Sequence, residues 1–199
     1  MSNVSDSGFW EAHYLSAQTG WEKGRCAPPV ARMLGEGLLP PHAHVAVLGA
    51  GRGHEALEVA ARGFESTAID FAASAIEATR VAAQHRALDV ETLRQDVFTL
   101  GTTHALTFDA VLEHTCFCAI DPARRDEYVE VVHAVLKPGG IIFGLFYAHG
   151  RPGGPPFDTS EEEVRRRFEA RFTVERMRRA PDSFSDRAGF ELEFVFRRK

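Results

Sequence analysis

The chain has 199 residues and a formal net charge of −5, with 44% hydrophobic and 26% charged residues. This length suits one domain around a single core, and the composition is that of an ordinary globular protein. Because the basic residues are scattered along most of the chain, the sequence disfavours a nucleic-acid partner, whose phosphates require a concentrated positive surface. The run Arg165, Arg166, Arg167 has acidic neighbours and is interpreted as a solvated helix face.

The sequence contains no long apolar stretch, and its polar start MSNVSDSGFWEAHY lacks the apolar centre of a signal peptide. We therefore expect a cytoplasmic protein without a membrane partner. The sequence leaves the oligomeric state open, with a monomer favoured. Cys26, Cys116 and Cys118 are too few for a disulfide framework. Cys116 and Cys118 would share a face on a strand, and we interpret them as buried small side chains rather than metal ligands, so no metal is expected.

Helix signals dominate the first part of the chain. Ser5 and Asp6 can cap a first helix, on which Trp10 and Tyr14 stand four residues apart and share a face. Glycines and prolines predict a loop over 18–29. A second helix is expected over 30–39, ended by prolines. We expect 1–199 to form a single domain, with 1–40 as a helical N-terminal lid.

From residue 44 onward, apolar runs alternate with helical patterns. Strands are predicted over 44–49, 66–70, 90–96, 108–114 and 141–147. Helices are predicted over 54–62, 72–87, 123–136 and 160–170, and LKPGG over 136–140 is expected to be a turn. The tail adds strands over 172–179 and 190–198.

This alternation predicts an α/β protein with a doubly wound, mostly parallel sheet. The strict polar–apolar alternation of 190–198 fits an antiparallel edge strand. Sheets of this kind bind ligands beyond the carboxyl ends of their strands, where the strand order reverses.

A glycine-rich turn follows the first strand of the predicted sheet. LGAGRGHEA contains Gly49, Gly51 and Gly53, which let the backbone turn tightly and approach a ligand. The second strand ends in Asp70 and Phe71, where an acid can accept hydrogen bonds from both ribose hydroxyls of an adenosine. Each feature alone also fits a plain strand-to-helix turn, but together they predict a nucleoside site.

The spacing of the loop favours S-adenosylmethionine over a nicotinamide dinucleotide. Dinucleotide sites prefer G-x-G-x-x-G/A, whereas His54 occupies the sixth position here. At the end of the third strand, Asp96 and Val97 could bind the adenine, although Asp96 could also be a turn-former.

With these motifs assembled, the chain resembles the thiopurine and halide/thiol S-methyltransferase family. The resemblance runs nearly end to end, through FWEAHY, TGWEKG, LGAGRG, QDVF, FDAVLEHTCFCAIDPARR, LKPGG and GGPPFDTSEEEVRRRF. It implies a seven-stranded sheet of the class I methyltransferase type with its last strand antiparallel. It also implies S-adenosylmethionine as the methyl donor and S-adenosylhomocysteine as the product.

Carried over by position, the resemblance assigns Trp10, Tyr14 and Trp21 to a cover over the cofactor and His114 to its methionine end and the acceptor. Aromatic faces suit a sulfonium, because their quadrupole attracts cations. Core packing of the first helix is the alternative for Trp10 and Tyr14. Around Trp21 the halide/thiol branch usually reads T-P-W-D, whereas Glu22 follows it here.

His114 differs from both branches, which have arginine or tyrosine at this position, so the acceptor stays open. His114 could supply charge or take a proton, and Glu113 could orient it, or the two could form a structural ion pair. We thus expect methyl transfer to a small soft nucleophile: a thiol, hydrosulfide, halide or thiopurine-like sulfur. The alternatives are an NAD-dependent oxidoreductase and a catalytically silent protein of the same fold.

Overall fold

The structure is a computed structural model that describes residues 4–199, so Met1, Ser2 and Asn3 of the expected lid lie outside the described residues. Its α-helices are α1 (Ser7–Leu15), α2 (Pro28–Leu34), α3 (His54–Ala61), α4 (Ala73–His85), α5 (Leu100–Thr103), α6 (Arg125–Val135) and α7 (Glu161–Phe168). Short 3-10 helices span Val97–Thr99 (η1) and Pro122–Arg124 (η2). The strands are β1 (His44–Leu48), β2 (Glu65–Asp70), β3 (Glu91–Arg94), β4 (Phe108–His114), β5 (Leu136–Tyr147), β6 (Phe172–Arg179) and β7 (Glu191–Arg198).

The strands form one seven-stranded sheet in the order β3-β2-β1-β4-β5-β7-β6. β1 pairs in parallel with both β2 and β4, and β7 is antiparallel to both of its neighbours. The predicted α/β architecture, with its mostly parallel sheet and antiparallel last strand, is confirmed. The order reverses between β1 and β4, and the switch-point rule therefore places a ligand there.

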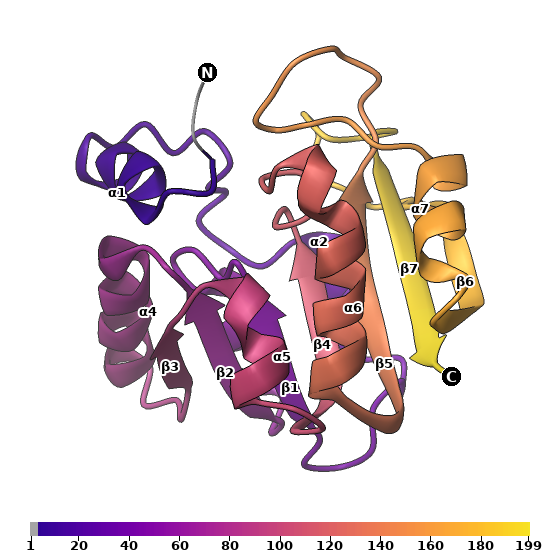
Figure 1. Cartoon of the computed structure of the whole chain (residues 1–199). Coiled ribbons are helices and arrows are strands. Elements are labelled where there is room, and N and C mark those ends of the chain that lie inside the picture. The colour runs from indigo at the N-terminus through magenta and orange to yellow at the C-terminus, as the bar shows by residue number, and fades with distance from the viewer. Residues whose placement is uncertain (1–3) are drawn as a thin grey trace.

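Strict alternation along the strands divides the core into two layers. In β1, Val45 and Val47 pack toward α2 and α3, whereas Ala46 and Leu48 pack on the opposite face, which α5, α6 and α7 cover. Successive side chains of a strand point to opposite faces, so neighbours in sequence enter different layers. Figure 1 shows α5 and α6 in front of the sheet.

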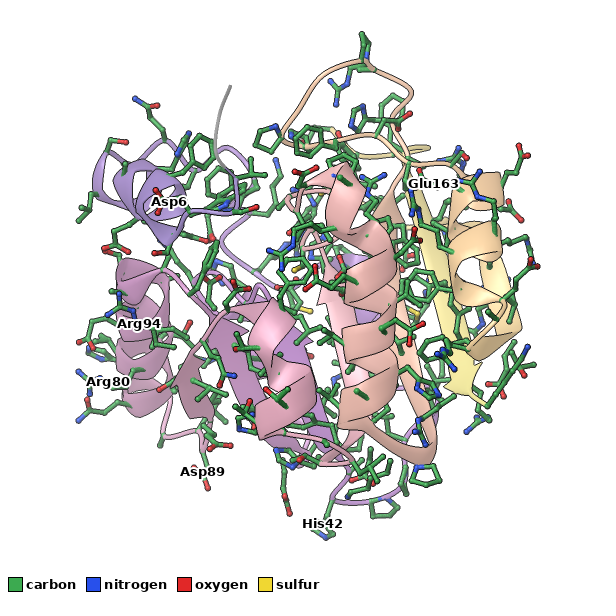
Figure 2. All side chains as sticks on the ribbon, in the orientation of Figure 1. Asp6, His42, Arg80, Asp89, Arg94 and Glu163 are labelled. Atoms are coloured by element: carbon green, nitrogen blue, oxygen red, sulfur yellow. The ribbon has the colours of Figure 1, made fainter. Side chains whose placement is uncertain are left out.

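One edge of the sheet carries the elements that the sequence linked to ligand binding. In Figure 1, α1 lies beyond the top of the sheet, above α4, and the connection after β5 also extends there. His42 and Asp89, which precede β1 and β3, lie at the opposite, lower edge in Figure 2, whereas Asp6 lies at the top. The top is therefore the edge where the parallel strands end.

The segment 1–40, expected to be a lid, has two parts in the structure. Asp6 caps α1, as expected, and accepts a hydrogen bond from the backbone N–H of Gly8 at 2.8 Å. The second helix starts earlier than predicted, at Pro28, and ends at Leu34 rather than at the prolines. Val30 and Met33 of this helix are fully buried against the sheet, so α2 belongs to the core and only the segment before it covers the edge.

LKPGG over 136–140 ends α6, as predicted, although it is part of β5, which is twelve residues long. The register of β5 with β4 is irregular there, because Phe108 pairs with Leu136 and Ala110 with Ile141. One prediction about strands was wrong. β7 is not an edge strand, because it lies between β5 and β6. Polar and apolar residues do alternate along the start of β7, but the face that carries Glu191 and Glu193 is also buried. Both carboxylates pair with arginines there.

Candidate functional site

A pocket of about 380 Å³ lies at the carboxyl edge of the parallel strands, within the size range of small-molecule sites. Residues that follow β1, β2, β3 and β4 form its floor, and the segment 4–25 covers it. Ten of the predicted site residues line it: Trp10, Tyr14, Trp21, Gly49, Gly51, Asp70, Phe71, Asp96, Val97 and His114. The pocket lies at the reversal of strand order.

Three aromatic rings of the N-terminal segment form a cluster over the pocket. The ring of Trp21 meets those of Trp10 and Tyr14 edge-on, with centroids 5.5 and 5.7 Å apart. The cluster packs against Ala72 and Ala75 at the start of α4. The rings thus both anchor α1, as the packing alternative stated, and line the pocket.

The backbone of the glycine loop lies against the segment 4–25 that covers the pocket. Gly51 has φ +55, a left-handed conformation that favours glycine. A Cβ at Gly51 would lie 3.0 Å from the Tyr14 hydroxyl oxygen and 3.2 Å from Oε1 of Glu22. A side chain at this position would therefore push the cover away from the loop.

Gly53, in contrast, does not line the pocket. It has φ +77 just before α3, and a Cβ there would lie 2.4 Å from the side chain of Thr79 on α4. The predicted cofactor contact of Gly53 is corrected: this glycine allows α3 and α4 to pack closely.

Asp70 lies at the end of β2 with its carboxylate facing the pocket. Its Oδ2 accepts a hydrogen bond from the backbone N–H of Gly51 and its Oδ1 one from that of Ala72, both at 2.9 Å. Burial raises the pKa of Asp70, although these two donors oppose the rise. Since each carboxylate oxygen can accept two hydrogen bonds, both oxygens retain acceptor capacity toward the pocket.

Asp96 forms a turn, which was the alternative given for it, and it also lines the pocket. Its Oδ1 accepts a hydrogen bond from the backbone N–H of Phe98 at 3.0 Å and caps η1. The same residue lines the pocket together with Val97 and Phe98. Asp96 is thus a turn-former whose turn presents apolar side chains to the pocket.

His114, the last residue of β4, lies in a buried cluster of charged side chains. Its Nδ1 is 3.0 Å from Oε1 of Glu55, at the start of α3. Its Nε2 is 3.0 Å from Nη1 of Arg187 and 3.5 Å from Oε1 of Glu191. Glu55 and Glu191 raise the pKa of His114 to about 9 against the opposing effect of burial.

Glu113 points to the other face of the sheet and does not line the pocket. Its Oε1 accepts a hydrogen bond from the backbone N–H of Phe117 at 2.8 Å, and its Oε2 one from the Tyr128 hydroxyl at 2.5 Å. Burial raises the pKa of Glu113 to about 7. The predicted catalytic role of Glu113 and its ion pair with His114 do not fit this geometry, because neighbours on a strand face opposite ways.

Glu55 and Arg187 are pocket residues that the sequence analysis missed. Glu55 stands directly after His54 in the motif already examined, and an acid in the first turn of a helix is a recognisable signal. Arg187 lies 73 positions after His114 in an irregular segment, and no local pattern marks it.

The segment 184–187 also holds the cover. Nη2 of Arg187 donates a hydrogen bond to the carbonyl oxygen of Trp21 at 3.0 Å, and Lys23 pairs with Asp186 at 2.6 Å. The guanidinium of Arg25 lies 5.4 Å from the centroid of the Phe184 ring. The cover is therefore fastened to α4 on one side and to this segment on the other.

The cysteines are free, and Cys116 and Cys118 are buried, as expected, but they lie in the loop after β4 rather than on a strand. Burial raises the pKa of Cys118 to about 12 and that of Cys116 well above the ordinary value, so neither is a thiolate nucleophile. Within residues 4–199, no group of three or more His, Cys, Asp or Glu side chains is placed to hold a metal ion.

Comparisons with known proteins identify the family of the chain. The family model of thiopurine S-methyltransferase matches residues 5–197. Over 166 residues the chain is 29% identical to a probable thiol methyltransferase 2 of Arabidopsis thaliana, covering 82% of this chain and 72% of the relative. It is 26% identical over 187 residues to a thiopurine S-methyltransferase of Xanthomonas campestris, covering 86% of each.

A solved structure shares the fold. It is the Burkholderia thailandensis 1,6-didemethyltoxoflavin-N1-methyltransferase with bound 1,6-didemethyltoxoflavin and S-adenosylhomocysteine. The TM-score is 0.80 at 22% identity, and the match covers 97% of this chain and 87% of that one.

Proposed function

Since the chain belongs to the thiopurine S-methyltransferase family and is an S-adenosylmethionine-dependent S-methyltransferase, we propose that its acceptor is a small soft nucleophile bound beside His114. The candidates are a thiol, hydrosulfide, halide or thiopurine-like sulfur. The observation that carries the proposal is the division of one pocket into a nucleoside half and a half lined by Glu55, His114 and Arg187.

The strand order produces this division. Asp70 and Asp96 follow β2 and β3 on one side of β1, whereas His114 and Tyr147 end β4 and β5 on the other. We assign the β2–β3 side to the adenosine of the cofactor and the β4–β5 side to the acceptor.

The residues of the nucleoside half fit S-adenosylmethionine. Both oxygens of Asp70 retain lone pairs for ribose hydroxyls, and Phe71, Val97 and Phe98 supply apolar surface for an adenine ring. The rings of the N-terminal cover suit the positive sulfonium. When bound, S-adenosylmethionine supplies an activated methyl group.

The chain itself aligns the acceptor with the methyl donor and excludes water, since methyl transfer is an in-line displacement. Burial raises the pKa of Tyr14, so its hydroxyl stays protonated and is no base at neutral pH. Cys116 and Cys118 also stay protonated, so none of these three groups is a ready base, and the charges of Arg187 and His114 are paired with Glu55 and Glu191. The acceptor half therefore favours acceptors that ionise easily, such as thiols.

Several finer assignments belong to this proposal. We propose a cytoplasmic monomer that needs no metal and has no nucleic-acid partner; the free cysteines agree with a reducing compartment. No helix within residues 4–199 is long and apolar enough to cross a bilayer.

The test is methyl transfer from labelled S-adenosylmethionine to a panel of thiols, hydrosulfide, iodide and a thiopurine, with matched oxygen analogues as controls. We expect transfer to the soft acceptors and little to the oxygen analogues. Preferential transfer to oxygen or nitrogen acceptors, or no transfer with any of them, would contradict the proposed acceptor class. NADH oxidation is measured in parallel, because it is the signature of the oxidoreductase alternative.

A further inference from the structure

The loop 115–120 follows β4 directly and forms a wall of the pocket on the acceptor side. Five of its six residues line the pocket: Thr115, Cys116, Cys118, Ala119 and Ile120. Thr115 has φ +69, a left-handed conformation that is unfavourable for a β-branched residue. Such a conformation persists only where the surrounding contacts hold it, so this loop requires an anchor.

The anchor lies behind the pocket and consists of Glu113, near the end of β4, and Tyr128 on α6. Both side chains are fully buried, and neither lines the pocket. Oε1 of Glu113 accepts a hydrogen bond from the backbone N–H of Phe117 at 2.8 Å, and its Oε2 accepts one from the Tyr128 hydroxyl at 2.5 Å. The rings of Phe117 and Tyr128 also meet edge-on, with centroids 5.6 Å apart. One carboxylate thus joins the backbone of the loop to the helix that covers the sheet.

The loop contacts two other parts of the pocket wall. A Cβ at Gly49 would lie 3.0 Å from Cβ and Sγ of Cys116, so the loop lies close against the glycine loop. The carbonyl oxygen of Cys118 accepts a hydrogen bond from the backbone N–H of Phe157 at 2.7 Å, and the prolines at 155–156 line the pocket. The position of the loop therefore sets the width of the pocket between the glycine loop and these prolines.

We propose that Glu113 and Tyr128 are positioning residues for the acceptor, which fix the loop 115–120 from behind and so set the room beside the methyl donor. Glu113 acts through its shape and its two hydrogen bonds, and neither its charge nor a proton transfer is required. Because a small misplacement of the reacting atoms slows an in-line displacement, a loosened loop should slow methyl transfer. This inference rests on the proposed function, since it concerns the acceptor wall of the same site.

Two substitutions of Glu113 separate its shape from its charge. In Glu113→Gln, the amide oxygen can still accept from Phe117, and the amide nitrogen can donate to the Tyr128 hydroxyl oxygen, so both contacts persist without a charge. In Glu113→Ala both contacts are lost, and a buried N–H is left without a partner. Tyr128→Phe is the milder variant, because it removes one contact and leaves the hydrogen bond to Phe117.

Ser66→Ala is the matched control for the loss of a buried hydrogen bond. Ser66 lies on β2, is 5% exposed, and its Oγ donates to the carbonyl oxygen of Ala56 at 2.9 Å. Neither residue lines the pocket. This variant should therefore change stability without changing the loop.

The first readout is hydrogen exchange of the Phe117 amide in the cofactor-free protein, which requires no turnover. Relative to the amide of Val47 in β1, which reports global unfolding, the Phe117 amide should exchange about 10- to 100-fold faster in Glu113→Ala. Glu113→Gln should protect it as the parent does. Tyr128→Phe should lie between the parent and Glu113→Ala, and Ser66→Ala should match the parent.

The second readout is kcat/KM for the best acceptor of the panel, together with the Kd of S-adenosylmethionine. Glu113→Ala should lower kcat/KM by about 5- to 100-fold, with a smaller loss in Tyr128→Phe. Glu113→Gln should retain most of the parent value. The Kd should change by less than about 3-fold in all variants, because the β2–β3 side of the pocket holds the adenosine.

Equal losses of kcat/KM in Glu113→Gln and Glu113→Ala would overturn the inference, because the charge would then be the essential property. Unchanged kcat/KM in both Glu113→Ala and Tyr128→Phe would overturn it as well. If Glu113→Ala does not fold, Tyr128→Phe decides by the same criteria.

The two readouts also separate this inference from the proposed function. If the parent transfers methyl to no acceptor while the Phe117 amide behaves as expected, the proposed function fails and the anchor of the loop stands. Normal methyl transfer by the parent, with the Phe117 amide equally protected in Glu113→Ala, would count against this inference alone.

Discussion

Two aromatic clusters in this molecule are built from similar residues but differ in how far their rings are buried. One joins Phe117, Phe146, Phe168, Phe194 and Phe196 between the sheet and the helices α6 and α7, with every ring at 1% exposure or less. The other joins Trp10, Tyr14 and Trp21 over the pocket, where the two tryptophans are only partly buried. Rings packed from all sides contribute to stability, whereas rings with one face left open can bind a ligand.

The backbone around each cluster explains the difference. Phe146 and Phe194 stand on the paired strands β5 and β7, with ring centroids 4.0 Å apart. The pocket cluster stands on a nine-residue helix and the loop after it, which lie outside the sheet. We therefore expect substitutions in the first cluster to change folding and those in the second to change binding.

The largest expected effect is that of Phe146→Ala. Its ring contacts those of Phe117, Phe168, Phe194 and Phe196, so truncation should lower the free energy of unfolding by about 3–5 kcal/mol. Urea denaturation of the cofactor-free protein measures this. Trp10→Ala is the matched aromatic control and should lose less than roughly 2 kcal/mol; equal losses would remove the distinction between the clusters.

An intermediate effect is expected at the floor of the pocket. Asp70→Ala should weaken binding of S-adenosylmethionine by about 1.5–3 kcal/mol, or roughly 10- to 150-fold, because charge-assisted hydrogen bonds to the ribose are lost. Calorimetric titration gives the Kd, and the parent should bind in the micromolar range. Asp70→Asn keeps the shape of the side chain and controls for the contacts to Gly51 and Ala72. Unchanged affinity in both variants, or tight NAD binding by the parent, would contradict the nucleoside assignment.

The smallest effect is expected in the cover. Trp21→Ala should raise the Kd of S-adenosylmethionine by about 2- to 30-fold, corresponding to a lost cation–π contact of about 0.5–2 kcal/mol, while Trp21→Phe should keep most of the affinity. If the segment through Gly24 acts as a lid, the cofactor should also slow proteolytic cleavage between residues 16 and 25 in the parent and much less in Trp21→Ala. Equal cleavage with and without cofactor would speak against a lid.

The sequence predicted the fold well because the parallel strands are buried on both faces. Runs such as HVAVLG over 44–49 and IIFGLFY over 141–147 need two covering layers, and the intervening helices supply them. The position of β7 was not predictable in the same way. The alternation of acidic and apolar residues over 191–194 is typical of a strand with one solvent-exposed face. Only the three-dimensional structure shows the arginines that neutralise Glu191 and Glu193.

The sequence indicated pocket-lining residues where a motif and a strand end coincide, as at Gly49, Gly51 and Asp70. The prediction was less successful where a partner lies far away in sequence, or where the alternation of side chains along a strand was overlooked. Glu113 and His114 are adjacent residues of one strand, so the period of two alone places them on opposite faces. Gly53 was assigned to the cofactor because a loop motif does not reveal that Thr79 packs against it.

The position of β7 between β5 and β6 has a consequence for synthesis. β7 follows all the other strands in sequence, yet it fills the gap between β5 and β6 and pairs with both along its length. Until these residues leave the ribosome, β5 has an unpaired edge and β6 has no partner in the sheet. A product that stops shortly before Glu191 would expose such an edge beside the uncovered phenylalanines of the core, which is a template for aggregation. Premature termination late in this chain should therefore yield insoluble protein rather than a nearly complete enzyme.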